Sequence, residues 1–188
     1  MKTMTDALKE WQVAVNALEQ GDTIMLLRKG GIREAGGRFR VERDRVLLYP
    51  TFEHQKPELL KPNYAAQVQP VGSGWHPAQV QIGAWARVTD VFQVTEADIM
   101  SALLPFHIWN QEFVTERLQW KPSQPLYVLL LRVHRLGQPQ QILYSDTYGG
   151  CKSWINLALP VPLDESYPVL DDTTYASRVE AIRSAIVH

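Results

Sequence analysis

Residues 79–94 form the longest regular alternation of apolar and polar side chains in the chain. Such alternation is typical of a strand with one buried face. The apolar positions are Val80, Ile82, Ala84, Ala86, Val88, Phe92 and Val94. Sixteen extended residues would span about 50 Å, which is too long for a straight strand in a chain of 188 residues. The alternation breaks at Asp90, so we expect a bulge or sharp bend there, and bent strands of this kind form small barrels.

Shorter apolar runs predict the other strands of the sheet. Their ranges are 23–27, 45–49 with Pro50 ending the strand, 126–136, 141–144 and 151–159. Residues 137–140 read Gly-Gln-Pro-Gln, which is typical of a hairpin connection, so the two strands that flank them are expected to pair antiparallel. Residues 56–77 are rich in proline, glycine and serine and predict a long irregular connection.

Apolar residues at helical spacing predict helices that cap this sheet. One helix starts after Thr5 or Asp6 and ends at Gly21, others lie within 95–113, and one is near the C-terminus. The predicted fold is α+β, with a mostly antiparallel, strongly bent sheet or pseudobarrel. We expect one domain over 1–162 and a C-terminal helical extension, 163–188, packed on it.

Composition places the chain among folded soluble proteins. It has 45% hydrophobic and 21% charged residues, a net charge of −1 and a pI of about 6.5. No apolar run approaches the roughly 18 to 20 residues of a membrane span, and the first residues lack a signal-peptide pattern. We therefore expect a cytoplasmic protein without a membrane partner. A single cysteine excludes an intrachain disulfide, and five scattered histidines give no zinc spacing, so no metal or other cofactor is predicted.

A basic, glycine-paired loop follows the strand at 23–27. From residue 28 to residue 45 the chain has seven Arg or Lys against three acidic residues. Paired glycines let successive backbone N–H groups face one concavity, an arrangement that binds phosphate or carboxylate. The candidate ligand residues are Arg28, Lys29, Gly30, Gly31 and Arg33. The glycine spacing matches neither GxxxxGK[ST] nor GxGxxG, which disfavours a nucleotide-cofactor fold. The alternative is a solvated loop whose arginines pair with nearby acids.

A second polar cluster, residues 49–55, follows the strand at 45–49. Its candidate ligand residues are Tyr49, Thr51 and His54, which could hydrogen-bond a base edge or a sugar. Glu53 and His54 could also serve as general acid and base, although neighbours on an extended chain point apart. The alternative is a turn whose side chains bond only its own backbone.

Residues 148–154 form a third cluster, with a glycine pair followed by a cation and an aromatic. Tyr148, Lys152 and Trp154 are candidate ligand contacts, because aromatic faces and a cation suit a base and its phosphate. Cys151 beside Lys152 fits a nucleophile, but its place among the apolar positions of the predicted strand favours a buried, inert thiol. Trp85 is a further candidate, because it falls on the polar side of its strand.

Two resemblances follow from these segments. The stretches LLRKGGIRE, RFRVERDRVLLYPTFEHQKPELLKP and TYGGCKSW resemble an uncharacterised bacterial family of unknown function that is well represented in cyanobacteria. The order of elements is also similar to the PUA-like fold, particularly its ASCH branch. The matching segments are GDTIMLLR, DRVLLY, IGAWARVTDVFQVT and YVLLLRVHRL.

The ASCH resemblance implies a PUA-like pseudobarrel with a pocket for a modified base or a short nucleic acid. ASCH domains carry a pattern like GKKTxELR, and some hydrolyse an acetylated cytidine. Gly21 and Arg28 match the ends of this pattern, whereas Asp22 and Thr23 replace its lysines and Leu26 replaces its glutamate. The resemblance therefore implies a binding pocket without the amidohydrolase chemistry.

The leading hypothesis is non-catalytic recognition of nucleic acid, with RNA favoured, or of a nucleotide-like anionic ligand. The enzymatic alternative is a metal-dependent nuclease or other hydrolase that uses Glu53, His54 and Asp146. A second alternative is a protein-interaction module without a small ligand. The oligomeric state is left open. The leading hypothesis requires residues 28–33, 49–55 and 148–154 to meet in one cleft.

Overall fold

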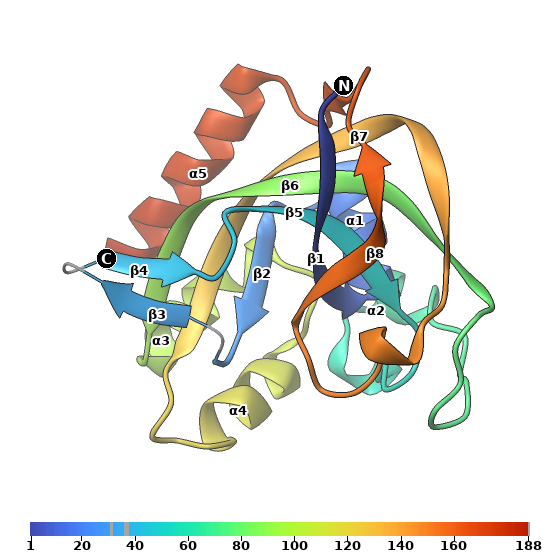
Figure 1. The fold of residues 1–188 in the computed structure, drawn as a ribbon. Coiled ribbons are helices and arrows are strands. Elements are labelled where there is room, and N and C mark those ends of the chain that lie inside the picture. Colours follow the sequence, from blue (N-terminus) through green and yellow to red (C-terminus); the bar gives the residue numbers. More distant parts are fainter. Residues whose placement is uncertain (31, 36–37, 188) are drawn as a thin grey trace.

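Two long paired strands organise the fold: β6 (Gln79–Val94) and β7 (Leu126–Leu143), which curve together across the molecule (Figure 1). The computed structural model describes residues 1–30, 32–35 and 38–187. The β6–β7 ladder is antiparallel, and its register shifts between Val88 and Asp90 and again between Ile82 and Ala84. The predicted irregularity near Asp90 is thus confirmed, and the second shift bends the other end of the same strand.

The sheet has seven strands in the described part of the chain, in the order β2-β7-β6-β5-β1-β8, with β9 paired to β7. The remaining five are β1 (Thr3–Trp11), β2 (Met25–Arg28), β5 (Arg45–Thr51), β8 (Trp154–Pro162) and β9 (Tyr167–Pro168). Strands β1 and β5 are parallel, and the other described pairs are antiparallel. A separate hairpin is formed by β3 (Ile32–Ala35) and β4 (Arg38–Val41).

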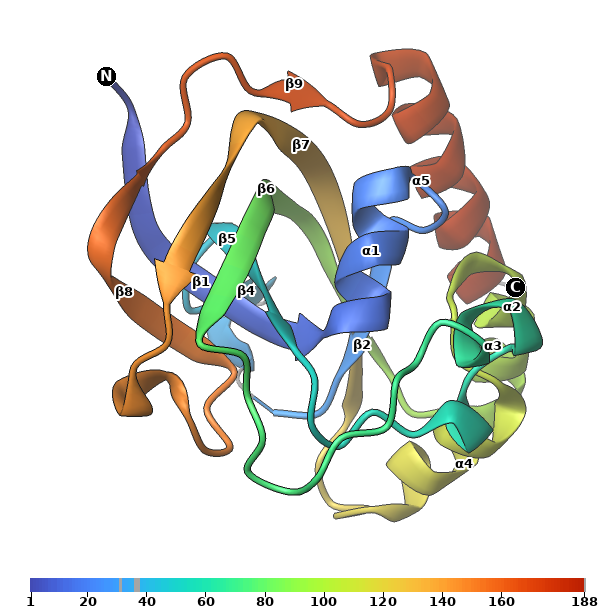
Figure 2. The same ribbon diagram turned by 90° about the vertical axis from the view of Figure 1, so that its right-hand side faces the viewer.

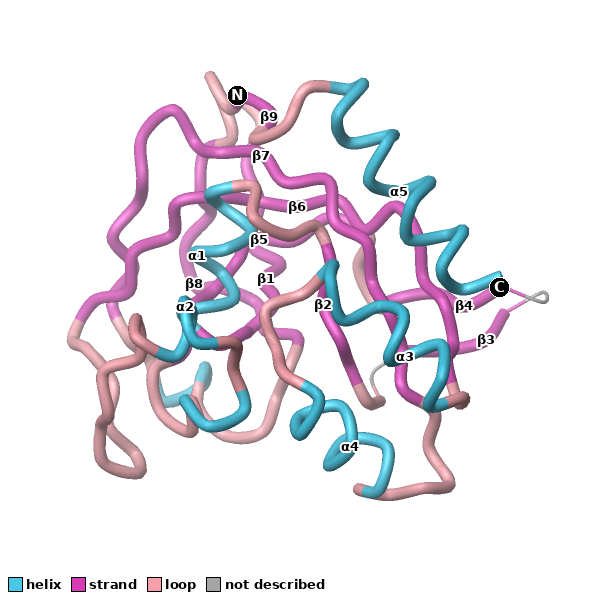
Figure 3. The backbone as a smooth tube through the Cα atoms, turned by 180° about the vertical axis from the view of Figure 1, so that it is seen from behind, coloured by secondary structure: helices cyan, strands magenta, loops and turns pink. Residues whose placement is uncertain are grey.

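The helices gather on one side of the sheet, as Figures 2 and 3 show. The α-helices are α1 (Gln12–Gln20), α2 (Pro62–Ala65), α3 (Ala97–Leu103), α4 (Gln111–Gln119) and α5 (Asp172–Val187). Three 3₁₀ turns are η1 (Pro57–Leu59), η2 (Leu104–Phe106) and η3 (Asp146–Tyr148). The predicted α+β class with a mostly antiparallel, bent sheet is confirmed. In the part of the chain that the structure describes, no helix is long and apolar enough to cross a membrane.

Two hydrophobic cores lie on the two faces of the sheet. The larger core joins the sheet to α1, α3, α4 and α5, and the smaller one is formed by β1, β5, β6, β7 and β8. Neighbouring residues of one strand therefore enter different cores: Ala7 and Leu47 the smaller, Leu8 and Leu48 the larger. Strands buried on both faces read as continuous apolar runs, which explains the sequence of β5.

The first predicted helix is wrong over its first half. Residues 3–11 form β1, and only residues 12–20 are helical. The apolar spacing that suggested one helix ran across two elements, because β1 buries both Ala7 and Leu8. Gly21 ends α1 as predicted, in the left-handed conformation that favours glycine at this place.

The predicted hairpin at 137–140 is also wrong, because β7 continues through it. Ala84 of β6 lies opposite Arg135 of β7, and Ile82 lies opposite Gln140. Residues 136–139 of β7 therefore correspond to the single residue Gly83 on β6, and they form a bulge. A Cβ on Gly137 would lie 2.9 Å from the Cβ of Glu165, and glycine permits this close approach. Turn-forming residues here bend the strand and do not reverse it.

The observed bounds of β5 and β8 also differ from the predicted ones, at their prolines and at Cys151. Pro50 does not end β5, because β6 pairs only with Arg45–Leu47 and the proline needs no ladder partner on that side. The last strand starts at Trp154 and continues through its prolines to Pro162, which an edge strand tolerates. Cys151 therefore lies outside the strand and is exposed, contrary to the predicted buried thiol.

We expect Gly21→Ala to lower the free energy of unfolding by about 2 kcal/mol, because the alanine must adopt a positive φ and is crowded. The φ of Gly21 is 77°, and an added Cβ would lie 2.9 Å from Cδ2 of Leu170. The matched control is Gly72→Ala, because nothing lies within 4 Å of its Cβ position. Urea denaturation of both variants checks this, and equal midpoints would contradict it.

Candidate functional site

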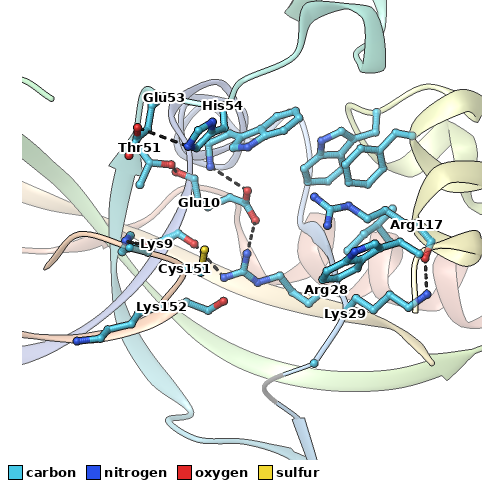
Figure 4. A pocket seen from close by; sticks show the side chains of 18 residues that line it. Lys9, Glu10, Arg28, Lys29, Thr51, Glu53, His54, Arg117, Cys151 and Lys152 are labelled. Carbon is cyan, nitrogen blue, oxygen red and sulfur yellow. Dashed lines mark hydrogen bonds and ion pairs between the residues drawn. The ribbon is translucent and has the colours of Figure 1, made fainter. Parts of the chain in front are cut away.

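A cavity of about 310 Å³ opens at the edge of the sheet where the parallel strands β1 and β5 end side by side, at Trp11 and Thr51. The end of β2, helix α4 and the loop at 150–153 complete its wall (Figure 4). Five cationic and two acidic side chains line it: Lys9, Arg28, Lys29, Arg117 and Lys152, with Glu10 and Glu53. We call this cavity the cationic pocket.

An ion pair between Arg28 and Glu10 forms the base of the cationic pocket. Nη1 of Arg28 lies 3.1 Å from Oε2 of Glu10, and its Nη2 donates to the backbone oxygen of Lys9 at 2.9 Å. The Glu10 side chain is 7% exposed and that of Arg28 is 17% exposed. The other Glu10 oxygen accepts from the backbone N–H of Trp11. Arg28 is thereby held in one orientation and still has N–H groups without a partner in the described residues.

Lys29, next in sequence, contacts the opposite wall. Its ammonium donates to the backbone oxygens of Arg117 and Leu118, at the C-terminal end of α4. Cations are favourable at this end of a helix. Desolvation, and secondly the Arg117 guanidinium, lower the pKa of Lys29. Lys29 therefore fastens α4 to the end of β2.

Helix α4 supplies a guanidinium between aromatic rings. Cζ of Arg117 lies 5.0 Å from the ring centroid of Phe113 and 5.7 Å from that of Trp120, distances typical of cation–π contacts. The Phe113 ring stacks on Trp109 at 4.9 Å, whereas Trp120 is 48% exposed at the rim. Burial lowers the pKa of Arg117, the Glu10 carboxylate opposes this shift, and the Arg28 guanidinium adds to it. An arginine nevertheless stays charged in proteins.

Lys9 joins β1 to the loop that precedes β8. Its ammonium donates to the backbone oxygens of Tyr148 at 2.6 Å and Gly150 at 2.8 Å. Desolvation lowers its pKa, and the Glu53 carboxylate opposes that shift. Two of its three N–H groups are thus used, and the neighbouring Cys151 and Lys152 are exposed at the rim.

Glu53 and His54 lie together in a turn and not in an extended chain. His54 has a φ of 66°, and its Nε2 lies 3.5 Å from Oε2 of Glu53. The same Glu53 oxygen accepts from the backbone N–H of Gly74 at 2.5 Å. The expectation that these two side chains point apart is wrong, because the left-handed residue reverses the chain. The described residues contain no group of three or more His, Cys, Asp or Glu side chains that could hold a metal ion.

A second, smaller cavity of about 40 Å³ adjoins the first and shares Lys9, Thr51 and Glu53 with it. Its remaining wall is mostly aromatic: Tyr49, Phe52, Trp75, His76, Tyr144 and Tyr148. We call it the tyrosine pocket. The Tyr148 hydroxyl accepts from the backbone N–H of Ala158 at 2.8 Å, whereas the buried Tyr49 hydroxyl has no hydrogen-bond partner in the described residues.

The structure brings most of the predicted site residues to these two adjoining pockets. Those that line the cationic pocket are Arg28, Lys29, Gly30, Thr51, Glu53, His54 and Lys152. Those that line the tyrosine pocket are Tyr49, Thr51, Glu53 and Tyr148. The three predicted segments thus meet, and the ligand-binding role of these residues stays a prediction.

Other predicted residues lie elsewhere. Trp85 stacks on His134 at 4.2 Å, and its Nε1 donates to Oγ of Ser166. Trp154 packs against the larger core, and Asp146 is exposed in η3. None of these residues lines either pocket.

Two residues of the basic loop lie partly or wholly outside the described structure. Arg33 is opposite Arg40 in the β3–β4 hairpin, and its side chain lies outside the described part. Gly31 lies outside the described residues.

Sequence reasoning missed Lys9, Glu10 and Trp11, because it assigned them to the first helix and not to a strand that ends at the pocket. It also missed α4 as a wall of the pocket. One signal was available there: Phe113, Arg117 and Trp120 are spaced by four and three residues, which places a cation between two aromatics on one helix face.

Removing Glu10 from the buried ion pair tests how much the pair contributes to the stability of the fold. We expect Glu10→Ala to lower the free energy of unfolding by about 3 kcal/mol, because it leaves the Arg28 charge buried without a partner. Asp6→Ala, which removes the partner of the exposed Arg43, should cost less than about 1 kcal/mol. Adding Arg28→Met to Glu10→Ala should recover part of the loss in urea denaturation. No recovery would show that the charge is not the cause.

His107 makes the stability of the pocket wall depend on pH. Its Nδ1 accepts from the backbone N–H of Trp109, which lines the pocket. Burial, and secondly Lys61, lower the pKa of His107 to about 3. The folded state keeps it neutral while the unfolded chain takes up a proton, so its stabilising contribution is complete above about pH 6.5 and is lost as pH falls toward 3.

We therefore expect a loss of at most about 1.4 kcal/mol of stability per pH unit below pH 6.5 from this residue. Urea denaturation at pH 7.5 and 5.5 measures it. His107→Asn should have a smaller difference between the two pH values, whereas substitution of the exposed His76 by asparagine should leave the difference unchanged. Equal pH dependence in the His107 variant and the wild type would contradict the assignment.

Comparisons with known proteins agree with the first resemblance. No curated protein matches the sequence. Crystal structures of two mutant forms of ZmASCH from Zymomonas mobilis are similar to this chain at 13% and 12% identity, with TM-scores of 0.44 and 0.43. Each similarity covers 81% of this chain, and 87% and 88% of the ZmASCH chains. A family described as a domain of unknown function, DUF1802, matches residues 7–181. The chain belongs to this DUF1802 family, which confirms the predicted membership of a family of unknown function.

Proposed function

We propose that the cationic pocket binds one nucleotide unit of a single-stranded nucleic acid, with RNA favoured, and does not transform it. The observation that carries this proposal is a cluster of cations beside an exposed aromatic ring in one cavity. In a chain with a net charge of −1, five cationic side chains face two acidic ones there. Since Glu10 already pairs with Arg28, the remaining charge is positive and favours an anion.

The aromatic wall favours an anion that also carries a flat ring. Trp120 presents nearly half of its surface at the rim, next to the guanidinium of Arg117. Bases stack on such rings with little sequence preference, and arginine adds a cation–π contribution. A cavity of about 310 Å³ is at the small end of ligand pockets, which suits one nucleotide and excludes a duplex. A nucleotide with its phosphate beside the cations and its base against the Trp120 ring would account for both the charge of the pocket and its aromatic wall.

RNA is favoured because the sequence resembles the PUA-like fold, whose members are commonly RNA-associated. The overall charge of the chain argues against a broad electrostatic footprint, so we expect a local contact with few phosphates. The hydrolase alternative is less well supported. Asp146 lies outside both pockets, and the Glu53 carboxylate already accepts a backbone N–H and faces His54.

Two variants test the proposal in fluorescence anisotropy with a labelled single-stranded RNA across a range of salt concentrations. Trp120→Ala should weaken binding roughly 5- to 150-fold, the loss of one base stack. Arg117→Met, which keeps the length of the side chain but removes the charge, should weaken binding and reduce its salt dependence by about one phosphate contact. The controls are Tyr167→Ala, an exposed aromatic on β9, and Arg183→Met on α5.

Binding that is insensitive to salt, or unchanged by both pocket variants, would contradict the proposal. The same preparations, incubated with RNA and Mg²⁺ or Mn²⁺, test the alternative. Metal-dependent cleavage that Glu53→Ala abolishes would favour a nuclease over a binding protein.

A further inference from the structure

We propose that the tyrosine pocket is a second base subsite, so that the ligand is an oligonucleotide of at least two units running from one pocket into the other. This inference rests on the proposed function of the cationic pocket. The two cavities adjoin, and Lys9, Thr51 and Glu53 line both. The two pockets therefore share a wall, and a chain bound in the first lies next to the second.

An unpartnered hydroxyl in the tyrosine pocket indicates a ligand there. The Tyr49 side chain is 3% exposed, and its hydroxyl has no hydrogen-bond partner in the described residues. Buried polar groups are nearly always paired, and an acceptor on a ligand that enters this pocket would pair the Tyr49 hydroxyl. Burial, with the nearby Tyr144 and Tyr148, raises the pKa of Tyr49 to about 12, and the group therefore remains a proton donor at neutral pH. A carbonyl oxygen or ring nitrogen on a base edge is such an acceptor.

The surrounding rings provide the stacking surface. Trp75 is 46% exposed and packs edge-on against Phe52, with ring centroids 5.9 Å apart. His76 and Tyr144, which also line this pocket, stack on each other. A space of about 40 Å³ is too small for a whole nucleotide but can admit the edge of a base. The rest of that base would lie over Trp75, as bases do on exposed aromatics.

The wall shared by the two pockets fits a phosphodiester that links two bases. Lys9 contributes an ammonium that uses two of its N–H groups on backbone oxygens and has one left in the described structure. The acid on the same wall, Glu53, accepts from Gly74 and faces His54. A cation with a free donor between two base-binding surfaces suits a bridging phosphate.

The test compares ligands of different length on the same protein. Isothermal titration with the four ribonucleoside 5′-monophosphates reports on the cationic pocket alone, and homopolymeric tetraribonucleotides report on both pockets. We expect at least one tetranucleotide to bind about 10-fold or more tightly than its monophosphate. Tyr49→Phe and Trp75→Ala should each weaken that tetranucleotide about 5- to 10-fold and leave the monophosphate unchanged.

The variants and their control separate binding from folding. Tyr49→Phe removes a hydroxyl that bonds nothing in the described residues, so its melting temperature should be equal to or above that of the wild type. Tyr64→Phe, whose hydroxyl faces Asp22 away from both pockets, is the matched control and should bind both ligands normally. Trp120→Ala should weaken monophosphate and tetranucleotide alike.

The outcomes distinguish the second base subsite from the proposed nucleotide binding by the cationic pocket. If monophosphate and tetranucleotide bind equally and neither Tyr49→Phe nor Trp75→Ala changes binding, the second subsite is wrong while the cationic pocket stands. If no monophosphate and no tetranucleotide binds, both proposals are overturned. A loss confined to the tetranucleotide supports both.

Discussion

The pairing of β6 with β7 is the constraint on which the rest of the structure depends. Its two register shifts bend a ladder that would otherwise be straight. As a result, β6 and β7 contribute side chains to both hydrophobic cores. The face covered by helices holds the larger core, and the strands on the other face close around the smaller one. β5 and then β1 and β8 follow β6 in the sheet, so the chain that forms the pocket edge is built outward from this one pair.

Those strand ends create the pocket. The parallel pairing of β1 with β5 brings their carboxyl ends to the same edge, and Glu10 and Thr51 of that edge hold each other through the Thr51 hydroxyl and the Glu10 backbone oxygen. Among the described strands of this predominantly antiparallel sheet, β1 and β5 are the one parallel pair, and they end at the cavity. The polar groups there belong to strand ends and loops, and their positions are fixed by the rigid sheet behind them.

Sequence predicted the local features of this chain better than its long-range ones. The bend near Asp90 and the stop at Gly21 follow from a broken alternation and a glycine, and both are present. The start of β1 and the continuity of β7 depend on which strands lie beside them, and no short pattern encodes that. For the same reason the sequence left open whether the three separated segments meet, and it could not place Arg117. Its position depends on where α4 lies, and α4 is tied to the residue after β2 by the bond from the Lys29 ammonium to the Arg117 backbone oxygen, 88 positions along the chain.

Arg28 and Lys29 are neighbours in sequence and yet bond opposite walls of the cationic pocket. Arg28 bonds Glu10 and Lys9 of β1, and Lys29 bonds the last carbonyls of α4. Two adjacent residues therefore connect β1 to α4 across the cationic pocket, one bonded to the strand and the other to the helix. A change in either side chain would therefore release one wall of the opening and, at the same time, remove a charge that lines it.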